Sequence, residues 1–303
     1  MDKYRIISFD GGGIRGIYTL TLLRRLETAV PGLLQGVHFM AGTSTGSLIA
    51  LGLASGLTID EGISLYRRLG DDVFQDTLWD DLTDLFNLIG AEYSTEDRLE
   101  VLRDLFGEMT LAELQRRVLV PAFDLDARQH GLRHWKAKIF HNFPGPDSDG
   151  EELIVDVAMR SSAAPTYFPV YQGYIDGGVV ANNPSMLALA QVMALPKEEL
   201  PLTSVRLLSL GTGRNLRYIP GDNMDWGMGQ WALRIIPLML EGVQGVADFQ
   251  CRTILGDSRY HRLNPVLLEP VEMDAVEKIE RLVEMANEVP LEKTVNWLET
   301  DFL

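Results

Sequence analysis

Residues 38–50 combine an apolar strand, a tight turn and the start of a helix in one short segment. The turn carries the pattern G-x-S-x-G at Gly42, Ser44 and Gly46. Because neither glycine has a side chain, the strand and the helix can approach closely, which forces Ser44 onto a strained, exposed corner. The helix dipole at this corner favours developing negative charge. The segment therefore predicts a nucleophilic serine, with an inert serine in a tight turn as the alternative.

A second cluster of glycines lies upstream, at another junction between a predicted strand and a predicted helix. Gly11, Gly12 and Gly13 follow a buried strand and lead into the apolar-periodic segment 17–26. Successive glycines leave backbone N–H groups uncovered at a helix start, where they can bind an anion or a developing oxyanion. We expect Arg15 to add fixed positive charge beside these groups.

The same glycines also satisfy G-x-G-x-x-G, the pattern of a dinucleotide-binding turn, from Gly11 through Gly13 to Gly16. That interpretation requires an acidic residue at the end of the next strand to hold the ribose. The next strand ends instead in the run from Gly42 to Ser44. The sequence therefore disfavours dinucleotide binding.

A third motif, Asp176-Gly177-Gly178, places a carboxylate at the end of a predicted strand. A carboxylate within hydrogen-bond reach of Ser44 could take the hydroxyl proton during attack and return it to the leaving group. An Asp-Gly turn in a hairpin is the alternative. Strands alternate with helices along the chain, which predicts a largely parallel sheet whose reactive groups gather at the carboxyl ends of strands. We therefore expect the three motifs to converge.

Together these motifs resemble those of the patatin-like phospholipase family. Several motifs in the family's order are far more specific than any one of them. The resemblance covers about residues 4 to 213 and rests on Asp10-Gly11-Gly12-Gly13-Ile14-Arg15-Gly16, Gly42-Thr43-Ser44-Thr45-Gly46, Ser161-Ser162-Ala163-Ala164-Pro165, Asp176-Gly177-Gly178 and Leu210-Gly211-Thr212-Gly213.

The resemblance implies a three-layer α/β/α fold and a serine lipid acyl hydrolase, of the phospholipase A or lysophospholipase type, that cleaves fatty-acyl esters of glycerolipids. It implies that Ser44 and Asp176 form a catalytic dyad without a histidine. The oxyanion hole would then consist of Gly11, Gly12 and Gly13, with Arg15 nearby. We expect neither a metal nor another cofactor, because no group of residues in the sequence shows metal-ligand spacing.

The chain of 303 residues, 46% of them hydrophobic, can bury one large core or two modest ones. We expect residues 1–213 to form the catalytic domain and residues 214–303 to form a helical C-terminal extension packed on the same domain. Within these regions, residues 205–210 predict a buried strand and residues 275–288 an amphipathic surface helix.

The formal charge of −16 argues against a nucleic-acid partner, since phosphate binding needs a basic surface. Anionic lipid would also repel the average surface, so peripheral contact with a membrane would have to come from local apolar or basic patches. We expect a cytoplasmic protein with transient membrane association, because neither a signal peptide nor an apolar run of bilayer length is visible. Cys251 is expected to be a buried small hydrophobe. The sequence carries no signal for an oligomeric state.

Three alternative functions stay open. A Ser44-Asp176-His261 triad of the α/β-hydrolase type would use the histidine that follows the acid in the chain. A non-catalytic sensor could use the glycine cluster to bind a nucleotide or phosphate. A phospholipase gated by a signalling nucleotide would combine the two activities.

Two further segments could contact lipid. Residues 78–89 place apolar side chains on one helical stripe, which indicates either a lid helix or an ordinary helix packed on the core. Residues 226–240 concentrate Trp, Met, Leu and Ile, which suits a fatty-acyl pocket, core packing or a dimer contact equally well.

Overall fold

The computed structural model describes residues 3–76, 95–196, 200–221 and 225–303. The predicted lid or core helix over residues 78–89 lies outside these ranges. Within the described residues, seven strands form one sheet in the order β4-β3-β2-β1-β6-β7, with β5 paired to β3. The strands are β1 (Tyr4–Phe9), β2 (Phe39–Gly42), β3 (Arg117–Gln129), β4 (Leu132–His141), β5 (Tyr174–Asp176), β6 (Val205–Leu210) and β7 (Tyr260–Leu263).

The sheet is mostly parallel and has helices on both faces, as the sequence predicts. Strands β2, β1, β6 and β7 and the first part of β3 run in the same direction, whereas β4 and β5 run antiparallel to β3. The helices are α1 (Gly16–Ala29), α2 (Thr45–Ser55), α3 (Ile59–Asp76), α4 (Thr95–Phe106), α5 (Ile154–Ser161), α6 (Gly178–Ala181), α7 (Ser185–Met193), α8 (Met228–Leu255), α9 (Ile279–Glu288) and α10 (Glu292–Trp297).

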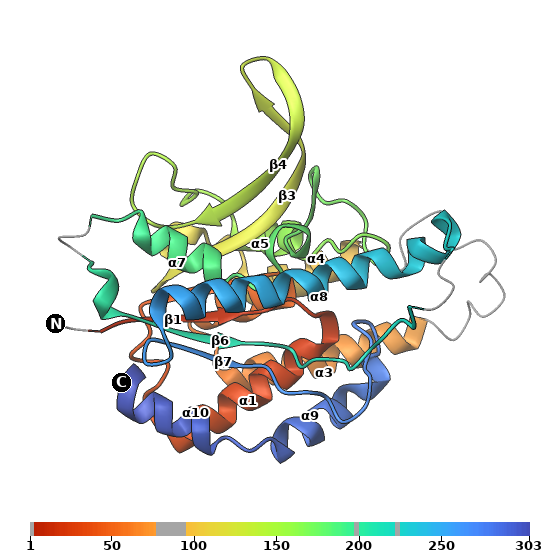
Figure 1. Ribbon diagram of the computed structural model, residues 1–303. Helices are drawn as coiled ribbons and strands as arrows, with labels where there is room; N and C mark the ends of the chain where they lie inside the picture. Colours follow the sequence, from red (N-terminus) through yellow and green to blue (C-terminus); the bar gives the residue numbers. More distant parts are fainter. Residues whose placement is uncertain (1–2, 77–94, 197–199, 222–224) are drawn as a thin grey trace.

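Two layers of helices enclose the sheet (Figure 1). Helices α1, α3, α9 and α10 cover one face and bury a core that includes Ile17, Leu22 and Phe302. Helices α7 and α8 cover the other face through residues such as Leu189 and Cys251. The predicted three-layer α/β/α architecture is therefore confirmed.

Strand β3 brings the ends of β2 and β5 together. Residues 117–119 of β3 pair in parallel with β2, and residues 122–124 pair antiparallel with β5. The carboxyl end of β2 and the carboxyl end of β5 therefore point toward each other beside the same strand. On β3, Leu119 pairs with Ala41 of β2, and Ala122 pairs with Asp176 of β5. These two positions of β3 are three residues apart, a distance of about 10 Å along the strand.

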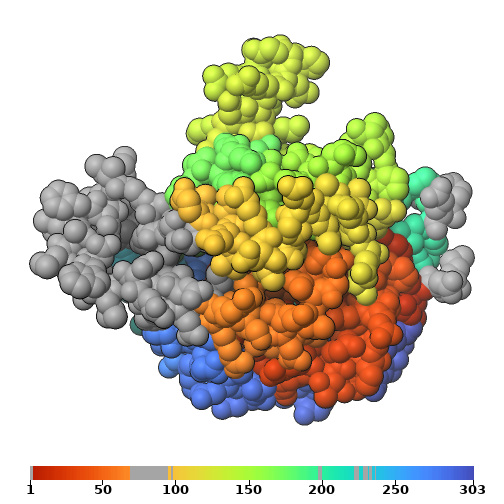
Figure 2. Space-filling model, turned by 180° about the vertical axis from the view of Figure 1, so that it is seen from behind, coloured from red at the N-terminus to blue at the C-terminus, as the bar shows by residue number. Residues whose placement is uncertain are grey.

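Beyond this junction, β3 and β4 continue as a long hairpin that stands clear of the body in both views (Figures 1 and 2). The two strands are 13 and 10 residues long. The register shifts between Asp124 and Ala127, which marks a bulge where the hairpin leaves the sheet.

The C-terminal portion contributes to the sheet as well as to the helical layers. Strand β7, which is not predicted from the sequence, pairs in parallel with β6. The predicted helix over residues 275–288 is divided into a short 3-10 turn and α9. Phe302 is fully buried, and its carbonyl accepts a hydrogen bond from Arg5 at 2.8 Å. Residues 214–303 are therefore more than a helical extension, because they complete the central sheet and its core.

Candidate active site

Ser44 lies on a strained turn between β2 and α2. Its φ of +54° is a backbone conformation that non-glycine residues rarely adopt and that persists only where the surroundings enforce it. The enforcement comes from close packing, because a Cβ on Gly42 would overlap the Gly46 carbonyl and a Cβ on Gly46 would overlap the Phe9 carbonyl. The Ser44 carbonyl accepts hydrogen bonds from the Ser47 N–H at 2.8 Å and the Ser47 hydroxyl at 2.6 Å.

Ser161 links the turn at Ser44 to the segment of Asp176. Its hydroxyl accepts a hydrogen bond from the Ser44 N–H at 3.1 Å and donates one to the Pro121 carbonyl at 2.7 Å. Its own carbonyl accepts a hydrogen bond from the Gly177 N–H at 3.0 Å. One residue at the end of α5 therefore fixes both sides of the junction between β2 and β5.

Asp176 lies at the end of β5 with its carboxylate facing Ser44. Asp176 is 5% exposed, and its carboxylate accepts a hydrogen bond from the Gly178 N–H at 2.6 Å. Burial raises the pKa of the carboxyl to about 6, while the Ser44 side chain, the Gly178 N–H and the charge of Arg98 act in the opposite direction. Asp176 is thus mostly ionised at neutral pH and able to accept a proton.

Arg98 lies on α4, and its positive charge lowers the pKa of Asp176. The guanidinium donates hydrogen bonds to the carbonyl of Ser162 at 3.1 Å and to its hydroxyl at 2.6 Å, and it lies 3.7 Å from the centre of the Phe168 ring. Burial lowers the pKa of Arg98 to about 10, so the side chain keeps its positive charge at neutral pH. Its position near Asp176 favours the ionised carboxylate.

The glycine loop after β1 has its peptide groups fixed by neighbouring residues. The Gly11 carbonyl accepts hydrogen bonds from Thr212 Oγ1 at 3.1 Å and from Asn182 Nδ2 at 3.4 Å. In a trans peptide the carbonyl and the next N–H point in opposite directions, so the Gly12 N–H is turned away from these partners. Within the described part of the chain, the N–H groups of Gly12 and Gly13 have no recorded acceptor.

The structure changes one expectation about this loop. The Gly11 N–H donates to the Asn182 carbonyl at 2.9 Å, so it is engaged within the protein and is not available as an oxyanion donor. Arg15 is 4% exposed and lies beside the loop, with its Nε 3.4 Å from the Gly12 carbonyl. This contact directs the Gly13 N–H to the opposite side.

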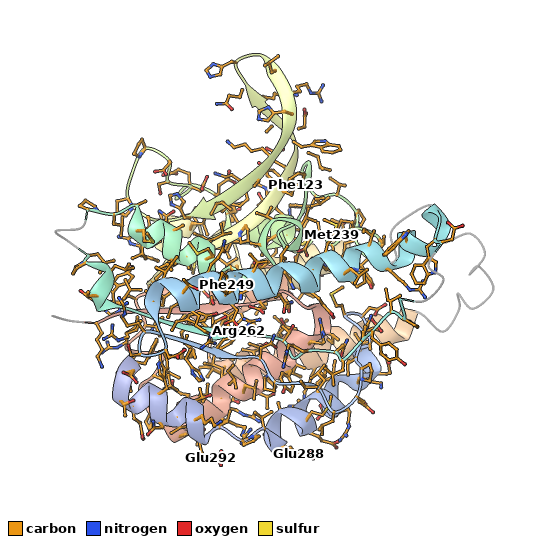
Figure 3. The ribbon with its side chains drawn as sticks, in the orientation of Figure 1. Phe123, Met239, Phe249, Arg262, Glu288 and Glu292 are labelled. Carbon is orange, nitrogen blue, oxygen red and sulfur yellow. The ribbon has the colours of Figure 1, made fainter. Side chains whose placement is uncertain are left out.

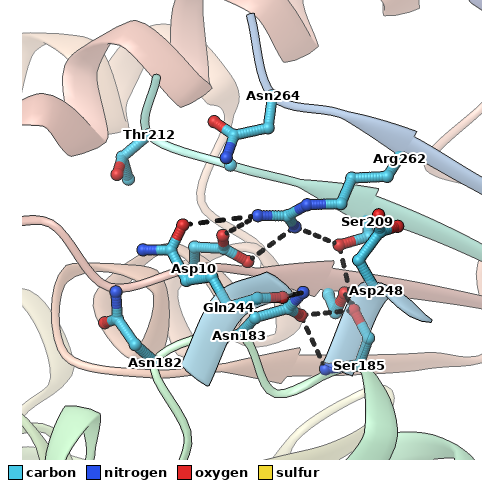
Figure 4. Close-up of polar contacts among 12 residues, drawn as sticks. Asp10, Asn182, Asn183, Ser185, Ser209, Thr212, Gln244, Asp248, Arg262 and Asn264 are labelled. Atoms are coloured by element: carbon cyan, nitrogen blue, oxygen red, sulfur yellow. Dashed lines mark hydrogen bonds and ion pairs between the residues drawn. The ribbon is translucent and has the colours of Figure 1, made fainter. Parts of the chain in front are cut away.

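A buried ion pair supports the base of the glycine loop (Figure 4). Asp10 is fully buried and accepts hydrogen bonds from both terminal nitrogens of Arg262 on β7, at 2.5 and 3.2 Å. Arg262 also donates to Ser209 Oγ at 2.7 Å, and Ser185 Oγ donates to the same oxygen at 2.9 Å. Breaking a buried pair leaves an uncompensated charge, which makes this connection between β1 and β7 costly to remove.

His261 lies away from Ser44. Strands β1 and β6 separate β7 from β2, so three strand spacings, about 14 Å, lie between the two strands. The His261 ring lies 2.9 Å from Thr294 Oγ1 and stacks on Trp297 with the ring centroids 5.2 Å apart. Burial lowers the pKa of this imidazole. His261 therefore packs against α10, and the structure does not bring it together with Ser44 and Asp176.

Among the residues that the structure describes, no three His, Cys, Asp or Glu side chains lie where they could share a metal ion. In the same part of the chain, no helix combines the length and apolarity needed to cross a bilayer. Cys251 is fully buried, and burial raises the pKa of its thiol to about 12, which is typical of a small core residue.

The family described as patatin-like phospholipase matches residues 7–189. The chain belongs to this family. Membership places it among hydrolases that act on lipid esters, and the predicted family and enzyme class are confirmed.

Known relatives cover most of the chain. Protein teg of Priestia megaterium is 36% identical over 239 residues, which are 75% of this chain and 69% of the relative. A cGAMP-activated phospholipase of Pseudomonas aeruginosa is 32% identical over 269 residues, which are 85% of this chain and 77% of the relative. Among solved structures, VipD of Legionella pneumophila aligns with a TM-score of 0.49 at 13% identity, covering 99% of this chain and 67% of VipD.

The roles of several residues around the site are not predicted from the sequence. Ser161 belongs to a recognised motif, but nothing local indicates that its hydroxyl binds the Ser44 N–H. Arg98 and Arg262 lie in segments with no motif at all, and Asn182 is only the fourth residue after the glycines of the third motif. Their roles depend on contacts between distant segments, which the spacing of residues does not encode.

The close approach at Gly46 predicts the effect of one added methyl group. Gly46→Ala would drive its Cβ into the Phe9 carbonyl, and overpacking of this kind costs about 1–3 kcal/mol. We expect a lower free energy of unfolding in urea and loss of ester hydrolysis.

Gly52→Ala is the matched control on the same helix. Its added Cβ would lie 3.3 Å from a terminal methyl group of Leu57, which can move, and alanine favours a helix by about 1 kcal/mol over glycine. We expect unchanged or slightly increased stability. A Gly46→Ala protein as stable and active as the wild type would contradict the enforced turn.

Proposed function

We propose that the chain is a serine lipid acyl hydrolase that cleaves fatty-acyl esters of glycerolipids with Ser44 as nucleophile and Asp176 as general base. The observation that carries the proposal is the pairing of β2 and β5 along β3, which brings Ser44 beside a buried carboxylate with a pKa of about 6. A base with a pKa near the working pH combines a high ionised fraction with useful proton affinity. Peripheral, transient contact of a cytoplasmic protein with a membrane is part of the proposal.

The proposed reaction has two stages. Ser44 Oγ attacks the ester carbonyl carbon while its proton passes to Asp176, and the N–H groups of Gly12 and Gly13 bind the resulting oxyanion. The C–O bond to the alcohol then breaks, and Asp176 returns the proton to the leaving oxygen. Water, deprotonated by Asp176, then attacks the acyl-serine; the bond from the acyl carbon to Ser44 Oγ breaks, Asp176 returns the proton to Oγ, and the fatty acid leaves.

The surroundings of Ser44 and Asp176 support a dyad without histidine. His261 is bound to Thr294 on the far side of two strands, so its imidazole is not positioned to orient or deprotonate Ser44. Desolvation of Asp176 supplies the basicity that an imidazole would otherwise provide. The Ser44-Asp176-His261 triad is therefore the weaker alternative.

A small apolar cavity lies along α2. It is lined by Leu48 and Ile49, which begin about one helical turn after Ser44, and by side chains from α1, α3 and α4 such as Leu20, Tyr66 and Phe106. Its volume of about 20 Å³ has room for about one water molecule, so an acyl chain would enter here only if these side chains moved apart.

Single substitutions separate the dyad from the triad. Ser44→Ala and Asp176→Asn should each lower kcat for a short-chain ester by at least about a hundredfold, because they remove the nucleophile or the proton acceptor. His261→Ala should keep most of the activity. The assay is run with and without EDTA, and with and without cGAMP, which activates the named relative from Pseudomonas aeruginosa.

Two outcomes would overturn this assignment. The first is loss of turnover in a His261→Ala protein whose unfolding transition shows that it is folded. The second is full activity in Asp176→Asn. Mass spectrometry of products from mixed phospholipids, galactolipids and neutral lipids, with Ser44→Ala as blank, identifies the glycerolipid class.

The raised pKa of Asp176 predicts the pH dependence. Protonated Asp176 cannot accept the Ser44 proton, so kcat/KM should fall as the pH drops through about 6. Arg98→Met removes the charge that favours the ionised carboxylate, which should raise the pKa of Asp176 and move the acid limb to higher pH.

Arg103→Met provides the control, since Arg103 lies on the exposed side of α4 and does not act on Asp176. We expect kcat/KM of the Arg103→Met protein to fall over the same acidic pH range as that of the wild type. An unchanged limb in Arg98→Met, or a shift to lower pH, would show that another group controls the profile.

A further inference from the structure

Helix α8 turns an uncharged face to the solvent. At about 100° per residue, Ile235, Leu238, Met239, Gly242, Val243, Val246 and Phe249 fall within an outward sector of about 140°. The charged residues between positions 235 and 253 are Glu241, Asp248 and Arg252, and these project from one flank of the helix within about 40°. A surface helix usually shows the reverse pattern, with its apolar side inward and its charges outward.

The outward side chains of this sector are strongly exposed. Phe249 is 70% exposed, Val246 56% and Met239 52%. Gly242 and Gly245 add no side chain, and the space above both is open. Figure 3 labels Met239 and Phe249 on α8, which crosses the front of the molecule in Figure 1. A contiguous apolar strip on a chain with a formal charge of −16 needs an explanation.

The inner side of the same helix is fixed to the proposed active site. Leu240 Cδ2 lies 2.6 Å from the position that a Cβ on Gly178 would occupy, and the Gly178 N–H binds the Asp176 carboxylate. One turn later, the Gln244 carbonyl accepts a hydrogen bond from Asn183 at 3.3 Å. The strip therefore lies on the outside of an element whose inside contacts the segment of the catalytic acid.

Amphipathic aromatic residues lie at the start of α8. Trp226 and Trp231 pack edge to face with their ring centroids 5.2 Å apart, and the Arg234 guanidinium lies 4.9 Å from the Trp226 ring centre. Tryptophan is typical of the boundary between lipid and water, where its ring meets hydrocarbon and its N–H meets water. In segment 226–240, for which an acyl pocket, core packing and a dimer contact were equally open, Ile235, Leu238 and Met239 are exposed.

We propose that the outward face of α8 is the surface by which the protein docks on a lipid bilayer. This inference rests on the proposed lipid acyl hydrolase function and specifies where the substrate surface is met. A stable protein interface takes about 20–30 residues from each side, far more than one strip of seven residues on a single helix. An apolar helix face suffices for a bilayer, because it can sink about 5–10 Å into the headgroup region.

The charges predict which bilayer is favoured. The outward sector carries no cation to attract anionic headgroups, and the remainder of the chain carries an excess of acidic residues. Binding should therefore be stronger to phosphatidylcholine vesicles than to vesicles that contain phosphatidylserine. The difference should shrink as salt screens the repulsion.

The test uses vesicle cosedimentation of the Ser44→Ala protein, which leaves the lipid intact. Val246→Ser with Phe249→Ser removes two exposed apolar side chains and should weaken binding to phosphatidylcholine vesicles about tenfold or more. Leu132→Ser is the matched control, because Leu132 is 70% exposed at the tip of the β3–β4 hairpin. Its binding should equal that of the parent.

A second readout separates docking from chemistry. With Ser44 restored, the Val246→Ser/Phe249→Ser protein should hydrolyse a dissolved short-chain ester at the wild-type rate and vesicle phospholipid at least about tenfold more slowly. If the wild type hydrolyses no ester but α8 still governs vesicle binding, the proposed function fails and the docking surface stands.

Three results would overturn the docking surface. Vesicle binding could be unchanged in the double variant, or it could be lost in Leu132→Ser instead. Light scattering could also show a wild-type dimer that the double variant converts to monomer, which would assign the strip to a second copy of the chain.

Discussion

The active-site geometry depends on one strand that extends past the end of its neighbour. β3 pairs first with β2 and then, along the same edge, with the antiparallel β5, so the two carboxyl ends face each other. Ser44 follows one of these ends and Asp176 terminates the other. Their mutual distance is therefore set by strand pairing, the most rigid connection that a sheet provides. The hydroxyl of Ser161 and its carbonyl then hold the two turns in register.

The glycine loop depends on a part of the chain that lies outside the matched family region. Asp10 is held by Arg262, which lies 252 positions further along the sequence. This buried pair joins β1 to β7 beneath the loop and explains how a C-terminal segment without a recognisable motif supports the proposed oxyanion donors. The hydrogen bonds to the carbonyls of Gly11 and Gly12 complete the arrangement and leave the next N–H groups turned away from their partners.

Sequence reasoning succeeds where the information is local. The strand, turn and helix around Ser44 follow from two glycines at fixed spacing, and the buried strand at residues 205–210 follows from its apolar run. Asp176 lies at the end of a strand, as its motif predicts, but the antiparallel pairing of that strand with β3 does not follow from the sequence, because spacing does not encode pairing partners. Gly11 cannot be distinguished by sequence from Gly12 and Gly13 as an oxyanion donor, but in the structure its N–H donates a hydrogen bond to the Asn182 carbonyl. These contacts join positions more than 50 residues apart, and only the folded chain reveals them.

Covalent labelling tests the central claim most directly, namely that Asp176 activates Ser44. The measurement is the rate at which a fluorophosphonate modifies wild-type protein and the Asp176→Asn variant at neutral pH, with the modified peptide located by mass spectrometry. The account predicts an adduct on Ser44 that forms at least about a hundredfold more slowly in the variant. Equal labelling rates in the two proteins, or an adduct on a different residue, would contradict it.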